Sequence, residues 1–168
     1  MPIDADFFRT LAGSFATGVT IVTTVDDTGQ PKGLTSSSYI GLSIEPPLML
    51  ISVDKRSRTL PALRHTRAFC INFLSADAEH LSDLFASKAE EKFSGFTWQP
   101  ADFAAGAPML IDHSVAIAEC QVTEVIEAGD HVVFIARVDG GIFLGGTPLV
   151  YYKRTYAAWP VAQPTLAR

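Results

Sequence analysis

The chain has 168 residues, of which 48% are apolar and 18% are charged, and its formal net charge is −5. This length suits a single domain spanning residues 1–168. Because the chain is acidic overall, it has no basic surface field that would attract nucleic acid, and we expect no nucleic-acid partner. No apolar run approaches the 18 or so residues of a membrane span, so we expect no membrane association.

The N-terminal segment is acidic and lacks the apolar core of a signal peptide, so we expect a cytoplasmic protein. Apolar side chains recur at roughly helical spacing across residues 1–16, and Asp4 is available as the cap. We therefore predict a short N-terminal helix that lies over the body of the domain.

A hairpin is predicted next. The β-branched run Gly18–Val25 is typical of a strand, and Asp26–Gln30 supplies the loop that leads to a partner strand over Lys32–Tyr39. Pro46–Pro47 cannot donate hydrogen bonds to a sheet, so the following strand is expected only at Leu48–Val53.

The rest of the chain continues this pattern of strands and short helices. Helices are predicted over Ser57–Arg64 and over Ala76–Phe85, the second capped by Ser75 and extended or followed by a turn over Lys88–Phe96. Strands are predicted at Ala68–Leu74, Val115–Ile126, His131–Asp139 and Leu149–Tyr152, with an edge at Arg154–Trp159. Turns are predicted at Glu127–Asp130, Gly140–Gly141 and Gly145–Gly146.

About seven strands joined mostly by hairpins, with two or three short helices inserted, indicate a mostly β fold. Because strands and helices do not alternate as in a parallel sheet, we predict an antiparallel barrel or sandwich. Residues 160–168 are small and contain proline, so we expect a mobile tail. Few charges and many aromatic residues favour the burial of further surface in a homodimer.

Cys70 and Cys120 lie inside apolar runs. We expect two buried free thiols, because a disulfide is improbable in a reducing compartment. Cysteine and histidine residues are not grouped at the spacing of zinc ligands, so no metal site is expected.

Two hydroxyl-rich segments flank the strand at Leu48–Val53. The run Thr35–Ser38 precedes it, and the loop Ser52–Thr59 follows it with three cations among its hydroxyls. Hydroxyls, cations and the amides at a helix start favour phosphate, whereas hydroxyls at a strand end favour a flat ring with polar edges. The alternative is that the first run faces solvent and the second is a solvated charge run.

Lys92, Phe93 and His131 are weaker candidates, because a charge at a helix end and a lone histidine on a strand are ordinary surface features. The chain has neither a GxGxxG nor a GxxxxGK[ST] motif, so a Rossmann or P-loop nucleotide site is not supported. No Ser-His-Asp or Cys-His arrangement stands out, and nothing in the sequence requires a nucleophile.

Motifs along nearly the whole chain, from about Phe7 to Tyr156, resemble the short-chain flavin reductases of the flavin-reductase-like domain. That family supplies the reductase partners of two-component flavin monooxygenases. The motifs are, in order, FATGVTIVTT (15–24), GLTSSS (33–38), LSIEPPLMLISVDKRSRTL (42–60), FCINFLSADAEHLSDLFA (69–86), KFSG (92–95), AECQV (118–122), GDHVVFIARV (129–138) and PLVYYKRTY (148–156). Each motif is weak alone, whereas all of them in this order are specific.

The resemblance implies a split β-barrel, usually a homodimer, that binds FMN or FAD and reduces it with NADH or NADPH. It implies that Thr35, Ser36, Ser37 and Ser38 line the edge of the isoalloxazine. It implies that Ser52, Asp54, Ser57, Arg58 and Thr59 surround the ribityl phosphate, with Lys92 and Phe93 nearby. It implies that Asn72, Phe73 and Leu74 border the flavin, that Tyr152 forms a wall, and that His131 lies at the catalytic position on the nicotinamide side.

The implied chemistry belongs to the two nucleotides. Hydride passes from nicotinamide C4 to flavin N5, while the protein supplies stacking geometry and electrostatics, and reduced flavin then goes to a partner monooxygenase. The lack of an evident acid–base pair fits this reaction. Two other classes stay open: a flavoprotein that keeps FMN as a prosthetic group for another redox reaction, and a non-catalytic flavin-binding protein.

Overall fold

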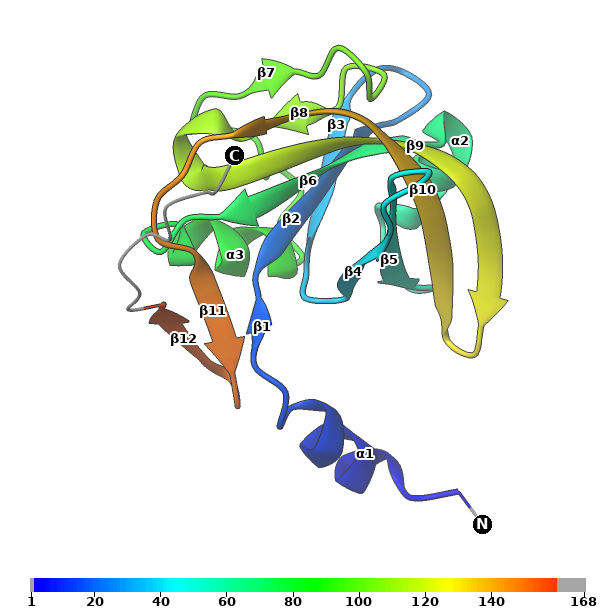
Figure 1. Cartoon of the computed structure of the whole chain (residues 1–168), viewed down its shortest axis with the longest axis vertical. Coiled ribbons are helices and arrows are strands. Elements are labelled where there is room, and N and C mark those ends of the chain that lie inside the picture. Colours follow the sequence, from blue (N-terminus) through cyan, green and yellow to red (C-terminus); the bar gives the residue numbers. More distant parts are fainter. Residues whose placement is uncertain (1, 160–168) are drawn as a thin grey trace.

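The computed structural model describes residues 2–159, so the tail expected at 160–168 lies outside the described residues. Within this range the chain forms three α-helices, one 3₁₀ turn and twelve strands (Figure 1). The helical segments are α1 (Ala5–Ala12), α2 (Leu60–Thr66), α3 (Glu79–Ala86) and the 3₁₀ turn Ile111–His113. The strands are β1 (Thr17–Gly18), β2 (Thr20–Val25), β3 (Pro31–Ser36), β4 (Tyr39–Ser43), β5 (Leu48–Asp54), β6 (Ala68–Leu74), β7 (Gln99–Pro100), β8 (Pro108–Met109), β9 (Ser114–Ala128), β10 (His131–Phe143), β11 (Leu149–Tyr152) and β12 (Thr155–Ala158).

Seven of these strands form one antiparallel sheet in the order β3-β2-β6-β9-β10-β5-β4. Its edge strands β3 and β4 are joined by only Ser37 and Ser38, so the sheet curls back toward its own beginning. No hydrogen-bonded ladder joins β3 to β4 in the part of the chain described, so the barrel is open along this line. The prediction of a mostly β, antiparallel fold is confirmed.

The main hydrophobic core lies inside this curled sheet. Phe69 on β6, Phe134 on β10 and Ile51 on β5 are fully buried, and Leu63 of α2 packs against the same cluster. A second cluster lies beneath α3, where Phe85 packs with side chains of β2, β6 and β11. This second cluster fixes α3 beside β3, which positions the groove described below.

Cys70 and Cys120 are both buried free thiols, as predicted. They lie on the neighbouring strands β6 and β9, and burial is the main reason that the pKa of Cys120 is raised to about 12. No group of three His, Cys, Asp or Glu residues between 2 and 159 could hold a metal ion. No helix in that range is long and apolar enough to cross a membrane.

Helix α1 differs from the expectation in both length and position. Its cap is Asp4, as predicted, because the Asp4 Oδ1 accepts a hydrogen bond from Phe7 N at 2.8 Å. The helix ends at Ala12 rather than at residue 16, since Gly13 follows as its C-cap. It has no buried residue, and it projects below the sheet toward the tip of β11 instead of covering the domain (Figure 1).

Several other boundaries also differ from the prediction. The strand expected over Lys32–Tyr39 breaks at Ser37, and β4 was not predicted. Ser75 does not cap α3, whose N-cap is Ala78 without a side-chain hydrogen bond. The segment Lys88–Phe96 is not helical, because the chain becomes extended at Ser87.

Gly140 and Gly141 lie inside β10 and form no turn. An added Cβ would lie 2.5 Å from Phe103 Cδ2 at Gly140 and 2.5 Å from Ile117 O at Gly141. Close packing against the Phe103 ring and the β9 backbone explains both glycines, and the β10 strand continues to Phe143.

Candidate functional site

A polar depression lies between β3, the β5–α2 loop and the end of α3. We call it the Arg58 groove. Its volume is about 740 Å³, within the usual range of ligand pockets. It is lined by Gly33, Leu34, Thr35, Asp54, Arg56, Ser57, Arg58, Thr59, Phe85, Ala86, Ser87, Lys88 and Lys92.

Gly33 forms the floor of this groove because β3 passes directly beneath α3. A Cβ at Gly33 would lie 2.7 Å from Phe85 Cε1 and 3.2 Å from Val22 O. Only a residue without a side chain allows β3 and α3 to approach this closely. Glycine at this position therefore leaves the space above the floor of the groove open.

Lys92 and Arg58 place positive charge over this floor. The Lys92 ammonium donates to Phe85 O at 2.7 Å, and the Arg58 guanidinium donates to Ala89 O at 3.1 Å. Neither makes an ion pair with a carboxylate of the described chain. Burial, followed by the neighbouring charge of Arg58, lowers the pKa of Lys92. The groove therefore presents cations whose charge an anionic ligand would neutralise.

The hydroxyls around the groove divide into structural and available ones. The Thr59 hydroxyl donates to Gly33 O at 3.0 Å, and the Thr35 hydroxyl donates to Ser82 O. These two bonds fasten the β5–α2 loop and α3 to β3. The Ser57 Oγ accepts from Thr59 N at 3.3 Å, which leaves its own proton free for a ligand oxygen.

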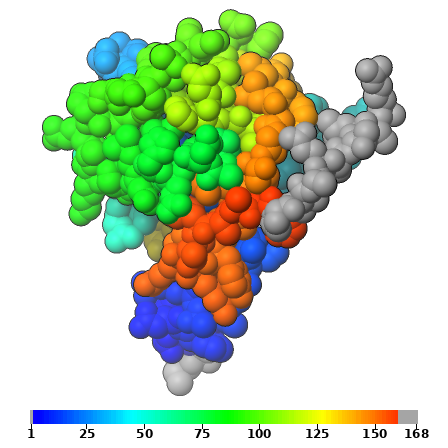
Figure 2. All heavy atoms as spheres, turned by 90° about the vertical axis from the view of Figure 1, so that its left-hand side faces the viewer, coloured from blue at the N-terminus to red at the C-terminus, as the bar shows by residue number. Residues whose placement is uncertain are grey.

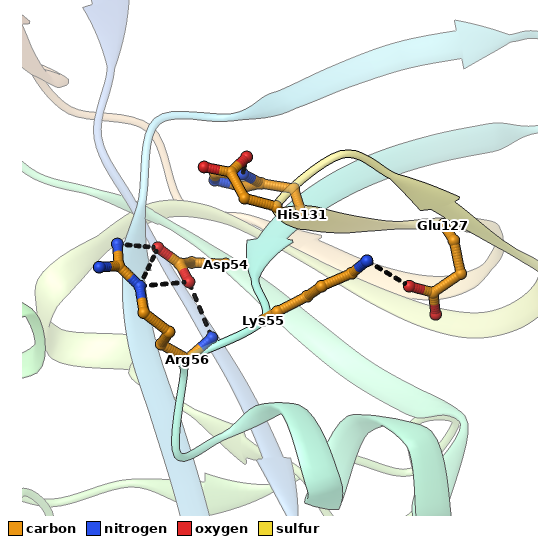
Figure 3. A network of polar contacts seen from close by, with 6 residues as sticks. Asp54, Lys55, Arg56, Glu127 and His131 are labelled. Carbon is orange, nitrogen blue, oxygen red and sulfur yellow. Dashed lines mark hydrogen bonds and ion pairs between the residues drawn. The ribbon is translucent and has the colours of Figure 1, made fainter. Parts of the chain in front are cut away.

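Asp54 and Arg56 line the groove, and His131 lies near Asp54 (Figure 3). His131 opposes Asp54 in the β10–β5 register. The Asp54 carboxylate accepts from Arg56 N and from Arg56 Nη2, each at 2.7 Å, and these bonds hold its pKa well below the usual range. Asp54 therefore orients Arg56 rather than offering a free acceptor.

Neighbouring charges fix the surroundings of His131. The His131 Nδ1 lies 2.7 Å from Asp130 Oδ1, so its ring is held from the turn side. Lys55 points away from Asp54 toward Glu127, with its Nζ 2.9 Å from the Glu127 Oε2 (Figure 3). Lys55 is thus neutralised outside the groove.

The predicted ring-binding run forms a smaller hollow next to the Arg58 groove. We call it the serine patch; its volume is about 200 Å³, and it is lined by Val19, Thr35, Ser36, Ser37, Ser82, Ala86, Tyr151 and Tyr156. Ser37 and Ser38 make no side-chain hydrogen bond within the described part of the chain, and Ser38 O accepts from Ser52 N at 3.0 Å. This backbone bond brings Ser38 and Ser52 together at the β4–β5 end.

A third depression, of about 670 Å³, lies between α1 and the β11–β12 turn. We call it the Arg154 groove. Figure 2 shows the segment of β11 and β12, in orange and red, directly above α1 in blue. Asp6, Arg9, Thr10, Ala12, Gly13, Phe15, Ser37, Tyr151, Lys153 and Arg154 line it. No pattern in the sequence indicated this groove, because α1 and the turn are some 140 residues apart.

Most of the predicted binding residues lie in or beside these depressions. The Arg58 groove contains Thr35, Asp54, Ser57, Arg58, Thr59 and Lys92. Phe93 lies with Arg58 and Lys92 in an adjoining cavity of about 220 Å³. The depressions are also lined by Gly33, Ser87, Lys88, Tyr151 and Tyr156, which no motif or spacing in the sequence indicated as site residues.

Seven predicted residues line none of these depressions: Ser38, Ser52, Asn72, Phe73, Leu74, His131 and Tyr152. Asn72 is fully buried; its Nδ2 donates to Ile21 O at 3.0 Å and its Oδ1 accepts from Leu110 N at 2.8 Å. Leu74 belongs to the core beneath α3, and Phe73 packs edge-on against Tyr39. Tyr152 is exposed beneath the ammonium of Lys153, 5.2 Å from its ring centre.

Known proteins share both the sequence and the fold of this chain. The family model described as "flavin reductase like domain" matches residues 12–160. A flavin reductase (NADH) of Kitasatospora aureofaciens is 38% identical over 167 residues, covering 96% of this chain and 85% of that protein. The reductase subunit HsaB of a flavin-dependent monooxygenase from Mycobacterium tuberculosis is 36% identical over 157 residues, covering 92% of this chain and 82% of that protein.

A solved structure extends the likeness to three dimensions. Nitrilotriacetate monooxygenase component B from Mycobacterium thermoresistibile superposes with a TM-score of 0.87 at 36% identity, covering 97% of this chain and 92% of that one. The match therefore extends over nearly the whole chain. The chain belongs to the flavin reductase like domain family.

Proposed function

We propose that the protein is an NAD(P)H-dependent flavin reductase, which transfers hydride from a nicotinamide nucleotide to FMN or FAD. The observation that carries this proposal is the Arg58 groove, in which cations without carboxylate partners adjoin the hydroxyls of the serine patch. A flavin nucleotide has this combination of features, a phosphate at one end and a flat ring with polar edges at the other. Membership of the flavin reductase family supports the same activity.

The residues present fit the flavin phosphate. We assign it to Arg58, Lys92 and the free hydroxyl proton of Ser57, because charge-assisted hydrogen bonds are the strong ones. Thr59 and Asp54 support this site indirectly, through the loop and through Arg56. Asn72, Leu74 and Tyr152 are not assigned to it, because Asn72 and Leu74 are buried and none of the three lines the Arg58 groove.

The isoalloxazine is assigned to the serine patch and its border. The hydroxyls of Ser37 and Ser38 can donate to ring carbonyls, each such bond contributing about 0.5 to 1.5 kcal/mol. The short link between β3 and β4 carries both residues, so the opening in the barrel is where the ring lies. His131 is assigned to the nicotinamide, because it lies on β10 opposite Asp54, which lines the groove.

The bound nucleotides supply the hydride chemistry, from nicotinamide C4 to flavin N5. The protein holds the two rings in contact and provides donors where negative charge develops on the reduced flavin. The described site contains no buried acid–base pair, which agrees with a reaction that requires none. The reduced flavin would pass to a flavin-dependent monooxygenase, because the HsaB relative is named as the reductase subunit of such an enzyme.

A direct assay tests this function. Purified protein is mixed with NADH or NADPH and excess free FMN or FAD, and the loss of absorbance at the NADH band is followed. Turnover proportional to protein supports the reductase. Tightly bound flavin that is reduced only once would point to a prosthetic-group enzyme, and yellow protein without NADH oxidation would point to a binding protein.

A further inference from the structure

The β11–β12 hairpin forms one wall of the serine patch, although it is not part of the seven-stranded sheet. Within residues 2–159, β12 pairs only with β11, and β11 pairs on its other side with the two-residue strand β1. The hairpin lies beside α3 (Figure 1). It contributes Tyr151 and Tyr156 to the patch lining, whereas α3 contributes Ser82 and Ala86. The distance between the hairpin and α3 therefore sets the width of the patch.

Tyr156 fastens this hairpin to α3. Its hydroxyl oxygen lies 2.9 Å from Ser82 Oγ, and its proton is donated to Asp83 Oδ1 at 3.1 Å. In the part of the chain described, these are the only side-chain hydrogen bonds that join residues 149–158 to another element. Because the Tyr156 proton goes to Asp83, the Tyr156 oxygen is the acceptor for the Ser82 hydroxyl.

Ser82 joins three walls of the patch at one residue. It belongs to α3, its carbonyl oxygen accepts from the Thr35 hydroxyl on β3, and its own hydroxyl bonds Tyr156 on β12. Ser82 is fully buried, and a buried hydroxyl that loses its partner costs free energy. The position of β12 is therefore coupled through Ser82 to β3, the strand that ends in the predicted ring-binding run.

The ring of Tyr156 also holds the second tyrosine of this wall. Tyr151 and Tyr156 are directly opposite in the β11–β12 register, and their ring centres are 5.0 Å apart. Both rings pack on the hydrophobic cluster beneath α3. Burial thus supplies most of the contact, and the Tyr156 hydroxyl fixes where along α3 the wall stands.

We propose that Tyr156 is a positioning residue for the isoalloxazine, which sets the width of the serine patch through its bond to Ser82. This inference rests on the proposed flavin reductase function. A gap of about 0.5 to 1 Å along a flat ring would remove roughly a quarter to a half of its dispersion attraction. The cations Arg58 and Lys92 line the Arg58 groove and not the patch, so Tyr156 should affect the ring and not the phosphate.

The test removes the hydroxyl alone with Tyr156→Phe. Ser82→Ala breaks the same bond from the α3 side. Tyr152→Phe is the matched control, because Tyr152 lies on the same hairpin, lines none of the depressions and makes no side-chain hydrogen bond within the described residues. The affinities of FMN and riboflavin are measured by fluorescence quenching. The kcat and the KM for each flavin are measured with NADH, and the stability of each variant by urea unfolding.

We expect Tyr156→Phe to raise the Kd and the KM of FMN and of riboflavin by the same factor, about three- to tenfold, as for one lost hydrogen bond. The kcat at saturating flavin should stay within about twofold of wild type, because binding and not chemistry is affected. Ser82→Ala should act in the same direction. The double variant should fall short of the product of the two single effects, since both remove one bond. Tyr152→Phe should resemble wild type throughout.

The outcomes separate this inference from the proposed function. Unchanged flavin affinities in Tyr156→Phe, in a protein that oxidises NADH, would overturn the inference alone. A loss for FMN without a loss for riboflavin would also overturn it, because the hydroxyl would then act at the phosphate. A lower kcat and lower stability with unchanged KM values would show a merely structural role and overturn it too. Wild-type protein that binds both flavins through Tyr156 but oxidises neither NADH nor NADPH would overturn the function alone.

Discussion

Lys92 is the half-buried cation of the Arg58 groove, and its ammonium group loses its proton more readily than that of an exposed lysine. Burial and then Arg58 lower its pKa in the free protein, whereas a bound phosphate would raise that pKa again. Flavin binding therefore takes up protons at alkaline pH. The affinity of a phosphorylated flavin should be full at neutral pH and should fall as pH rises toward the lowered pKa of Lys92.

Fluorescence titrations of FMN and riboflavin from neutral pH to about pH 10 would measure this effect. FMN should show the loss, and riboflavin, which lacks the phosphate, should not. In Lys92→Met the FMN affinity should be lower at neutral pH and nearly independent of pH. A pH profile that is the same for FMN and riboflavin would contradict a phosphate at Lys92.

His131 is a positioning candidate whose contribution should depend on the donor. Its ring is held by Asp130, and it does not line the Arg58 groove that contains Arg58 and Lys92. We expect His131→Ala to raise the KM for NADH more than it weakens flavin binding. Steady-state kinetics with NADH and flavin varied separately would show this, and an unchanged KM for NADH would remove His131 from the nicotinamide side.

At the scale of elements, the contact between β3 and α3 controls the depth of the site. Gly33 lies beneath Phe85, and an added methyl group would lie 2.7 Å from the Phe85 ring and 3.2 Å from Val22 O. The backbone oxygen cannot move aside easily, so the α3 side must shift. We expect Gly33→Ala to destabilise the fold by about 1 to 3 kcal/mol, the usual cost of overpacking.

Urea unfolding followed by circular dichroism would measure this loss, and FMN affinity would fall as the floor rises. Gly41 offers a matched control, because it also lies in a strand and a Cβ there would meet no atom within 4 Å. Gly41→Ala should leave both quantities close to wild type. Equal stability of the two variants would show that α3 does not press on β3.

Elements whose signal is local were predictable from the sequence, and contacts between distant elements were not. Both β6 and β11 were predicted with their observed ends, because each is an apolar run bounded by turn residues. The bonding of Asn72, which was predicted to border the flavin, was not predictable for the opposite reason. Its amide bonds join Ile21 O and Leu110 N, which only the folded sheet brings together.

The candidate site shows the same division. The hydroxyl-rich ends of β3 and β5 were predicted as binding segments from their residue composition. The fold places them side by side through the hydrogen bond from Ser52 N to Ser38 O. Which hydroxyls are free was not predictable, because Thr35 and Thr59 donate to backbone oxygens of segments far along the chain. The Arg154 groove was likewise hidden, since α1 forms one of its walls.

For the whole molecule, the exposed apolar surface argues for a second copy of the chain. Phe7, Phe8 and Leu11 on α1 are between 51% and 59% exposed, and Ile44 beside β4 is 94% exposed. Helix α1 has eight residues, none of them buried, and an isolated helix of this length is marginal in water. A covering surface would stabilise it, and we propose that a homodimer provides this surface.

Sedimentation velocity should therefore show a dimer for the wild-type protein. We expect Phe8→Glu/Leu11→Glu to shift the protein toward monomer, because two buried carboxylates would lack partners at the interface. Gln30→Glu adds a charge in the exposed β2–β3 loop and should leave the dimer intact. A wild-type monomer would contradict the homodimer. A dimer that survives the α1 substitutions would place the interface on another apolar surface, such as the one at Ile44.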